Sequence, residues 1–170
     1  SLLHVYVNLV RSLNAGRDEL IEYPGSPLIA SLVMREEDRG ILCEVQAEEC
    51  AALRSALSGD ARFAIHERDG YAAMNALLPP AQRRGLVLID PPFEAQDGEF
   101  RLIEKALADA AKRWPGGIYA VWYPIKLRQQ VQPFHRWLGK SGFDKILVAE
   151  LLLHPDNSAL RLNGCGMAII

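Results

Sequence analysis

The stretch Leu86-Val87-Leu88-Ile89-Asp90-Pro91-Pro92-Phe93 decides the fold class of this chain. Four apolar residues in a row predict a short strand that is buried on both faces, as in a parallel sheet. Two prolines then end the strand, because proline fixes φ and has no N–H to donate. Asp90 and Phe93 are therefore expected on a rigid turn at the carboxyl end of a central strand, where open α/β sheets bind ligands. A plain proline turn with a capping aspartate is the alternative that this stretch leaves open.

Helical and strand patterns alternate on both sides of this stretch. Apolar residues at spacings of three and four predict helices over residues 2–13, 27–37, 47–57, 71–78, 98–114 and 126–138. Short apolar or alternating runs predict strands over residues 41–45, 62–66, 86–89, 118–123, 146–153 and 167–170. Alternation predicts a mostly parallel sheet with helices on both faces, and the last two strands predict an antiparallel hairpin. Ser26 is expected as an N-cap, and Pro133 is expected to kink or divide its helix.

Composition narrows the class of protein. The 170 residues are enough for one domain with a core, and a net charge of −2 excludes a general basic field for nucleic acid. Three cysteines without CxxC spacing suit a reducing compartment, and the four histidines show no metal-ligand spacing. No run is apolar enough to span a membrane, and the start lacks the features of a signal peptide. We therefore expect a cytoplasmic protein that binds neither metal nor membrane.

Three of the predicted strands end in an acidic residue: Glu44, Asp69 and Asp90. Because the carboxyl ends of parallel strands share one edge, we expect the three carboxylates on that edge. Glu44 is suited to accept hydrogen bonds from both hydroxyls of a ribose. Asp69 is suited to accept one from an adenine amino group, while Gly70 lets the ligand approach the backbone closely. Each acid alone also fits an exposed strand end, and it is the presence of three that favours a binding edge.

The Asp90 turn combines groups that suit an exocyclic amine. An ionised carboxylate only accepts hydrogen bonds, and so does the carbonyl of Pro91, which Pro92 cannot engage because it lacks an N–H. Two neighbouring acceptors suit an amino group with two hydrogens to donate, and Phe93 is expected to stack on the ring that carries the amine. Asp90 is then suited to accept the proton lost when that nitrogen attacks an electrophile.

The Asp-Pro-Pro-Phe sequence at residues 90–93 resembles the (Asp/Asn/Ser)-Pro-Pro-aromatic motif of methyltransferases that modify amino groups of DNA and RNA with S-adenosylmethionine. Longer segments resemble one family, the bacterial large-subunit ribosomal RNA adenine-N6-methyltransferases, whose members also carry a label for the use of external DNA as a nutrient. These segments are residues 23–30, 79–80, 83–92, 117–124 and 127–130, so the resemblance covers nearly the whole chain.

The resemblance implies which residues hold the cofactor S-adenosylmethionine. Ser26, in the Pro-Gly-Ser-Pro turn, matches a cofactor-binding serine. Glu44 matches the acid at the cofactor ribose, and Asp69 with Gly70 matches the pair at the cofactor adenine. Asp90 matches the catalytic residue, assigned as proton acceptor.

The substrate side follows from the same resemblance. Pro91, Pro92 and Phe93 are assigned to the substrate adenine. Phe93 stands where members of the family usually have tyrosine, and because the stacking ring is kept we expect the same class of activity. Four basic residues near the site are candidates for RNA phosphates, with solvated surface charge as the competing interpretation: Arg83, Arg84, Lys126 and Arg128.

The chain departs from the family at its start. Members begin with His-bearing segments and a central strand followed by a Gly-rich Asp-Thr-His-Ala-Gly-Ala-Gly loop under the methionine part of the cofactor, and none of this occurs in the 170 residues. They also continue past Ile170. We therefore expect one methyltransferase domain over residues 1–170, truncated at both ends and inactive alone, with a helical segment at 1–22 packed on it or inserted into it.

The sequence thus predicts a Rossmann-like α/β methyltransferase fold: a mostly parallel sheet that lacks its first central strand and ends in a C-terminal antiparallel hairpin. The expected activity is methyl transfer from S-adenosylmethionine to the N6 amino group of adenine in a hairpin or loop of large-subunit ribosomal RNA. A non-catalytic nucleic-acid-binding protein linked to the uptake or use of external DNA is the alternative. A nucleotide-binding enzyme of another kind is less favoured, because the chain contains no P-loop and no GxGxxG.

Overall fold

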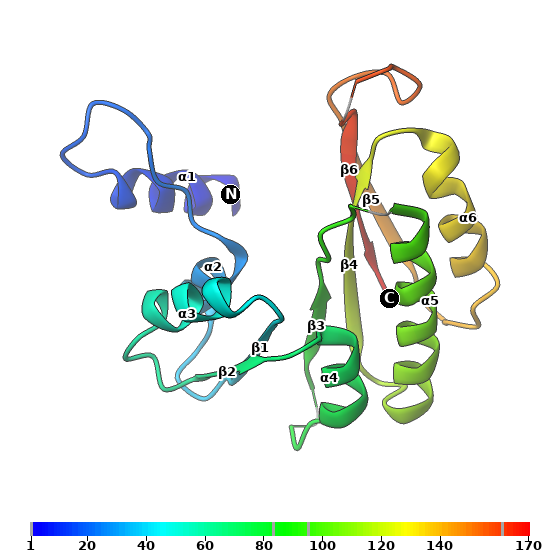
Figure 1. The fold of residues 1–170 in the computed structure, drawn as a ribbon, viewed down its shortest axis with the longest axis horizontal. Helices are drawn as coiled ribbons and strands as arrows, with labels where there is room; N and C mark the ends of the chain where they lie inside the picture. Colours follow the sequence, from blue (N-terminus) through cyan, green and yellow to red (C-terminus); the bar gives the residue numbers. More distant parts are fainter. Residues whose placement is uncertain (1, 83, 95, 161) are drawn as a thin grey trace. The chain divides into compact units, whose positions relative to one another are not determined.

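The computed structural model describes residues 2–82, 84–94, 96–160 and 162–170 (Figure 1). The chain divides into two units, Ser1–Gly70 and Tyr71–Ile170, called here the first and the second unit. The predicted organisation as one domain with a helical segment at residues 1–22 stays a prediction.

The first unit is built around a pair of parallel strands. Its elements are α1 (Leu2–Leu13), α2 (Ser26–Val33), β1 (Gly40–Glu44), α3 (Ala47–Ala56) and β2 (Phe63–Glu67). β1 and β2 pair in parallel with Glu44 opposite Glu67, and α3 connects them as the alternation predicts. Cys50, on α3, has no exposed surface and packs inside this unit. The carboxyl ends of both strands therefore lie at one edge of this two-stranded sheet.

Polar side chains hold the segments around this sheet together. Asn14 is buried; its amide donates to the carbonyls of Val10 and Glu22, and its oxygen accepts from the N–H groups of Ile21 and Glu22. The Arg62 guanidinium binds the Asp60 carboxylate and donates to backbone carbonyls at the end of α2. Buried polar groups that are paired in this way fix loop positions that have little apolar packing.

α2 begins one residue earlier in the chain than the sequence predicts. Gly25, not Ser26, is the N-cap, since its backbone is extended (φ −73°, ψ 166°) and its carbonyl accepts the first helical hydrogen bond from Ile29. Ser26 is the first helical residue, and no side chain caps this helix. The helix ends at Val33 rather than near Glu37, where the extended Met34 follows. Pro27 fits the first or the second position of the helix, because the N–H groups of the first turn have no partner within the helix.

The second unit contains a four-stranded mixed sheet. Its elements are α4 (Gly70–Leu77), which begins at the last residue of the first unit, β3 (Leu86–Ile89), α5 (Gln96–Arg113), β4 (Ile118–Ile125), α6 (Arg128–Leu138), β5 (Leu147–Leu152) and β6 (Gly164–Ile169). The strand order is β3-β4-β6-β5. β3 and β4 are parallel, while β6 is antiparallel to both β4 and β5, which confirms the predicted hairpin.

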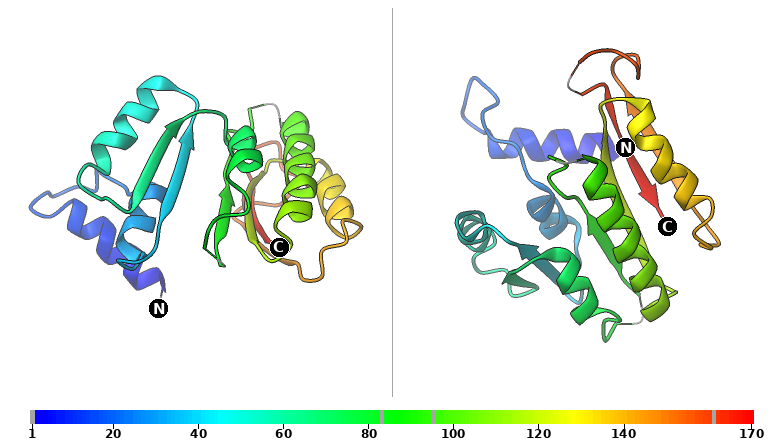
Figure 2. Two further views of the ribbon diagram at one scale, coloured as in Figure 1. Left: turned by 90° about the horizontal axis from the view of Figure 1, so that it is seen from below. Right: turned by 45° about the vertical axis from the view of Figure 1, so that its right-hand side comes forward.

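The core of the second unit lies between this sheet and α5 and α6, which run side by side over one face of it (Figures 1 and 2). Alternate residues of β4 point into the core, and Tyr119, Val121, Tyr123 and Ile125 are all almost fully buried. Gly166 on β6 leaves space for the Tyr123 ring, because a Cβ at this position would overlap it. The helices supply the remaining apolar side chains, among them Phe100, Ile103, Leu107, Val131, Phe134 and Leu138.

Two expectations about this unit were wrong. β3 is not buried on both faces: Leu86 and Leu88 are 60% and 45% exposed, whereas Ile89 is 6% exposed. In an alternating strand, polar residues indicate which face is exposed. The run at residues 86–89 is wholly apolar, so its sequence does not indicate that one face of β3 is exposed. Of the two outcomes expected for Pro133, division of the helix is wrong, since α6 continues from Arg128 to Leu138, and a kink stays a prediction. The buried contacts of Val131, Phe134 and Leu138 outweigh the one hydrogen bond that proline removes.

Candidate active site

The Asp90 turn lies where the sequence predicts it, directly after the last residue of β3. Ile89 is buried in the core, and Asp90 is the first residue outside the strand. The carboxyl group is reached by solvent yet crowded by neighbouring atoms, and this partial desolvation raises its pKa above the ordinary value. Pro91 is half-buried and Pro92 is exposed. A carboxylate of raised pKa is a stronger base than an ordinary one once it is ionised.

Phe93 ends the turn in an unusual conformation. Its φ is +50°, in the left-handed region, which costs a residue other than glycine about 1–2 kcal/mol. The ring is 2% exposed and packs edge-on against Phe100 and Trp122, with centroid distances of 5.3 and 6.0 Å. In this arrangement the ring supports the turn from inside the core and presents no face to a ligand. Stacking on a substrate adenine stays a prediction, and it requires the ring to leave this packing.

Lys126 connects the Asp90 turn to the end of β4. Its ammonium donates a hydrogen bond to the carbonyl oxygen of Phe93 at 3.2 Å. Since this carbonyl belongs to the left-handed residue, the bond stabilises the turn in its strained shape. The predicted role of Lys126 at an RNA phosphate stays a prediction, and the side chain lies beside the turn as that role requires.

The predicted cofactor acids Glu44 and Asp69 lie at the same edge of the first unit. Glu44 is the last residue of β1, Asp69 follows β2 by two positions, and the N–H of Arg68 donates to the Glu44 carbonyl at 2.9 Å. One Glu44 oxygen accepts a hydrogen bond from the N–H of Gln46 at 2.7 Å. This contact fixes the carboxylate while leaving its second oxygen to accept a further bond. Asp90 follows a strand of the second unit, so a shared edge for all three acids stays a prediction.

Gly70 and Ser26 complete the predicted cofactor residues. Nothing lies within 4 Å of where a Gly70 side chain would begin, so a ligand can approach this backbone closely. Ser26 is exposed in the first turn of α2, whose N–H groups are not capped by a side chain. The ribose and adenine half of S-adenosylmethionine needs acceptors for its hydroxyl and amino groups and a backbone that it can approach closely. The Glu44 carboxylate, Gly70 and the start of α2 suit these needs.

The four basic candidates differ in their surroundings. Arg84 is exposed, and Arg83 lies outside the described residues. Arg128 forms ion pairs with Glu150 at 2.7 Å and with Asp156 at 2.9 Å, which occupy its guanidinium. A phosphate has to compete with two carboxylates for this residue, whereas the exposed Arg84 is open to solvent.

Sequence reasoning missed a polar network at the end of β4. Asn163 is fully buried, and its amide donates to the backbone carbonyls of Lys126 at 2.6 Å and Ser158 at 3.1 Å. Its own N–H donates to the carbonyl of Ile125. Asn163 thereby joins the end of β4 to the loop between β5 and β6. The dipeptide Asn163-Gly164 is typical of a turn, and the sequence around it does not indicate that Asn163 is buried.

A second part of this network surrounds Tyr123. Its hydroxyl lies 2.9 Å from His135 Nε2 and 3.1 Å from a Glu150 oxygen. Burial, followed by the charge of Glu150, raises the pKa of Tyr123, so the phenol stays protonated. These residues bind one another inside the protein and have no signal in the sequence beyond the polar positions of α6 and β5.

Two features of the described residues bear on the metal site and the membrane span that the sequence argues against. In that part of the chain no group of three or more histidine, cysteine, aspartate or glutamate residues is arranged to hold a metal ion. No helix there is long and apolar enough to cross a membrane.

Comparison with solved structures shows the fold. A crystal structure of a Legionella pneumophila protein matches with a TM-score of 0.88 and 32% identity, over all of this chain and 62% of that one. A Corynebacterium diphtheriae domain described as a precorrin-6Y C5,15-methyltransferase matches with a TM-score of 0.50 at 17% identity, over 99% of this chain and 95% of that one. The match to the second protein is evidence of fold alone. Together the two matches confirm the predicted α/β fold class.

Comparison with curated sequences shows the family. Ribosomal RNA large subunit methyltransferase J of Haemophilus influenzae is 41% identical over 165 residues, which are 97% of this chain and 58% of the relative. The Escherichia coli protein of the same name is 40% identical over 168 residues, 99% of this chain and 59% of the relative. The chain thus spans about three fifths of their length. The family model described as ribosomal RNA large subunit methyltransferase D, RlmJ, matches residues 1–170, and the chain belongs to that family, as the resemblance of its motifs predicts.

Proposed function

We propose that the protein containing this chain transfers a methyl group from S-adenosylmethionine to the N6 amino group of an adenine in large-subunit ribosomal RNA. Membership of the family over the whole chain supports the reaction class and the kind of substrate. The observation that carries the assignment is the exposed Asp90, held at the end of a core strand and followed by two prolines.

The Asp90 turn accounts for the amino group as the target. The Asp90 carboxylate and the Pro91 carbonyl both accept hydrogen bonds, so together they suit the two hydrogens of an exocyclic amine. The buried Phe93 ring and the hydrogen bond from Lys126 to the Phe93 carbonyl support the turn in this conformation. Orienting an amine in this way brings its lone pair into line for attack, which is the main contribution a protein makes to such a transfer.

Asp90 is proposed as the general base. Partial desolvation raises the pKa of its carboxyl, so its ionised form takes a proton more readily than a fully solvated aspartate does. The activity is expected to rise with pH as Asp90 ionises, and to do so above the ordinary pKa of aspartate.

The first unit is proposed to hold the nucleoside half of the cofactor. Glu44 accepts hydrogen bonds from the ribose hydroxyls, Asp69 accepts one from the adenine amino group, and Gly70 leaves space beside the ring. Ser26, in the uncapped first turn of α2, is a further polar contact. When bound, S-adenosylmethionine supplies a methyl group already activated on its sulfonium.

The target adenine is proposed to lie in a loop or an unpaired stretch of a hairpin. A base inside a duplex has its amino group engaged in pairing, so methylation needs a base that is splayed out of the helix. The protein is proposed to act in the cytoplasm, where it meets ribosomal RNA.

The test is Asp90→Ala in the complete protein, with transfer of labelled methyl groups to an adenine-containing RNA hairpin as the readout. Loss of a general base is expected to lower kcat by about 10²–10⁴-fold while cofactor binding persists. Glu94→Gln, an exposed acid beside the turn, is the matched control and should retain activity. Unchanged transfer by Asp90→Ala would refute its role.

Cofactor titration separates this function from a non-catalytic nucleic-acid-binding protein. The enzyme is expected to bind S-adenosylmethionine, and Glu44→Ala to weaken that binding, because the ribose loses an acceptor. If the complete protein binds RNA but shows no affinity for the cofactor, the non-catalytic function is favoured instead.

A further inference from the structure

The end of β4 is joined to the loop between β5 and β6 through one buried residue, Asn163. Its N–H donates to the carbonyl of Ile125 at 2.8 Å, and its side-chain amide donates to the carbonyl of Lys126 at 2.6 Å. Its own carbonyl accepts from the N–H groups of Leu153 and His154 at 2.9 and 3.1 Å. Two consecutive carbonyls beside the Lys126 side chain are therefore held by a residue that is itself fixed through its backbone.

A second pair of contacts holds the chain just after Lys126. The N–H of Arg128 donates to the carbonyl of Asp156 at 3.0 Å, and the two side chains form an ion pair at 2.9 Å. Asp156 belongs to the same loop as Asn163. The backbone that carries Lys126 is thus bound to this loop on both sides, so its side chain starts from a fixed point.

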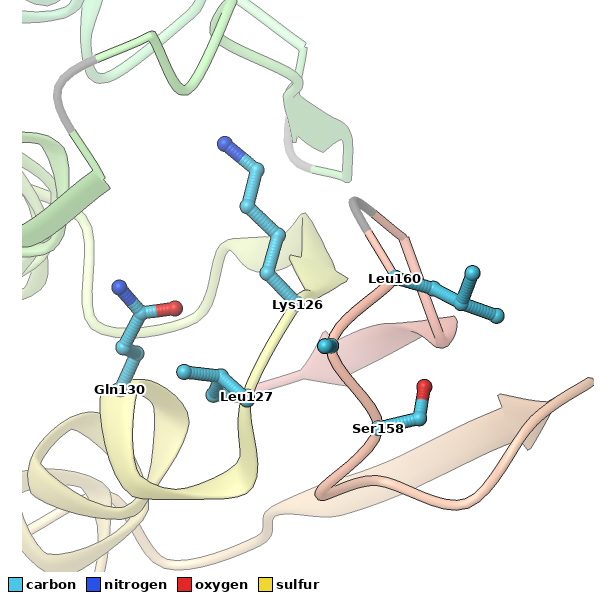
Figure 3. Close-up of a pocket in the computed structure, with 6 residues that line it drawn as sticks. Lys126, Leu127, Gln130, Ser158 and Leu160 are labelled. Atoms are coloured by element: carbon cyan, nitrogen blue, oxygen red, sulfur yellow. The ribbon is translucent and has the colours of Figure 1, made fainter.

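The Lys126 side chain extends from this fixed point to the Asp90 turn. Its stem lines a pocket with Leu127, and it points away from Ser158 (Figure 3). Its ammonium donates to the carbonyl of Phe93 at 3.2 Å in a partly buried contact. A lysine side chain loses much rotamer entropy when its ammonium is held at one atom, and a fixed backbone leaves less freedom to be lost.

The accepting carbonyl belongs to the strained residue of the turn. Phe93 has a φ of +50°, a conformation that persists in a residue other than glycine where the surroundings enforce it. Phe100 and Trp122 hold its ring, whereas Lys126 holds its peptide group. Without this bond the backbone is free to leave the left-handed region, and the Asp90 carboxylate moves with the turn. Small displacements of a catalytic group lower a rate strongly, because the reacting atoms have to be aligned.

We propose that Lys126 is a positioning residue for Asp90, and that Asn163 acts through Lys126, so that the loop between β5 and β6 sets the geometry of the turn. The proposal rests on the proposed function, because it takes Asp90 as the general base. It differs from the role at an RNA phosphate that the sequence predicts for Lys126. A bond to a carbonyl of the turn affects the chemical step, whereas a phosphate contact affects the affinity for RNA.

The experiment replaces Lys126 in the complete protein and measures methyl transfer to an RNA hairpin. Lys126→Met keeps the stem and removes the ammonium, so kcat is expected to fall about tenfold, as for a lost hydrogen bond from a charged donor. The KM for the RNA and its dependence on salt are expected to stay unchanged. Lys126→Arg keeps a charged donor and is expected to recover most of the lost kcat. Lys140→Met, at an exposed position after α6, is the matched control and should keep wild-type kinetics.

A phosphate contact predicts the opposite division between kcat and KM. In that case Lys126→Met raises the KM for the RNA, leaves kcat unchanged and lowers the slope of log affinity against log salt by about one. This result overturns the proposal, and so does a variant with unchanged kcat and KM.

The part of Asn163 is measured by a double-mutant cycle. Asn163→Ala is expected to lower kcat about tenfold in the wild type and by less than about twofold in Lys126→Met, because both changes remove the same support. Asn157→Ala, at an exposed position of the same loop, should have no effect in either background. Ser158→Ala removes the hydroxyl that donates to the Asn163 side-chain oxygen, and its smaller loss should show the same dependence on Lys126 if Asn163→Ala does not fold. Losses that add in full overturn the role of Asn163.

A readout without methyl transfer separates this proposal from the proposed function. The Phe93 ring packs against Trp122 at 6.0 Å, so a change in the turn shifts the fluorine NMR resonance of fluorotryptophan at position 122, assigned with Trp122→Phe. We expect a shift in Lys126→Met and Asn163→Ala, and none in Lys140→Met. If the resonance shifts in this way but the wild type transfers no methyl group, support of the turn by Lys126 stands and the enzyme assignment fails. If methyl transfer occurs and neither kcat nor the resonance depends on Lys126, the assignment stands and the positioning role fails.

Discussion

The first and second units each contain a pair of parallel strands, yet they stabilise it by different means. Of the described apolar residues that are buried, only Val10, Pro24, Cys50 and Leu57 belong to the first unit. The second unit buries a continuous cluster that includes Tyr119, Tyr123, Phe134 and their neighbours on α5. The first unit relies on Asn14 and on the Arg62–Asp60 pair to hold its loops.

This difference matches the proposed division of labour. The residues proposed for the cofactor are carried by loops and strand ends of the unit with little apolar core. The proposed base, Asp90, follows a strand that is fixed on a large core, and its turn is held from inside by Phe93. A general base has to be positioned closely to be effective, whereas a cofactor contact tolerates more movement.

The largest effect on this comparison is expected from Phe134→Ala. Phe134 has no exposed surface and stacks on Phe100 at 5.0 Å, so its removal is expected to destabilise the second unit by about 3–5 kcal/mol. All three tryptophans belong to this unit, so their fluorescence during urea unfolding follows it selectively. Gln132→Ala, an exposed change on the same helix, is the control. A loss no larger than that of the control would show that this core does not stabilise the unit.

Asn14→Ala is expected to have an intermediate effect. The substitution leaves four backbone groups without their side-chain partner, at a cost of about 2 kcal/mol within the first unit. Hydrogen exchange at the amides of Ile21 and Glu22, which donate to Asn14, should become faster. Asn8→Ala changes an exposed asparagine on α1, the helix that Asn14 directly follows, and should leave these amides protected. Unchanged exchange in Asn14→Ala would contradict polar stabilisation of this unit.

The smallest effect is expected from pH acting on His135. Burial lowers the pKa of His135, with Glu150 opposing and Arg128 adding to the shift. The unfolded chain therefore binds the proton first, so stability is complete above the ordinary pKa of about 6.5 and falls as the pH drops below it. Denaturation of the second unit between pH 8 and 5 measures this, at intervals of about half a unit.

His135→Gln should flatten that part of the pH profile, while His154→Gln, at an exposed position, should leave it unchanged. If the stability of His135→Gln falls with decreasing pH as steeply as that of the wild type, other groups cause this pH dependence.

Most elements and the Asp90 turn were predictable because their signals are local. Prolines 91 and 92 end β3 by their own covalent structure, and the alternation of patterns predicts the parallel pairs and the final hairpin. The N-cap of α2 was wrong by one residue, because glycine and serine both suit this position and their order does not decide which is used.

The candidate site was predictable only in part. Glu44 is the last residue of its strand, and Asp90 and Asp69 follow theirs by one and two positions, close to where the sequence predicts them, since the end of a strand is a local property. The ring of Phe93 lies in the core instead of on an exposed surface, which depends on the distant Phe100 and Trp122. Arg128 is engaged by Glu150 and Asp156, which come from other parts of the chain.

The sequence by itself determined the family, the fold class and the position of the Asp-Pro-Pro-Phe turn, because apolar runs, prolines and motif residues act through neighbours in the chain. Only the tertiary structure decided that β3 has an exposed face, that Phe93 is buried with a left-handed backbone, and that Asn163 is buried and joins β4 to the loop between β5 and β6. Burial and pairing depend on which distant side chains fill the space around a residue, and that information is spread over the whole chain.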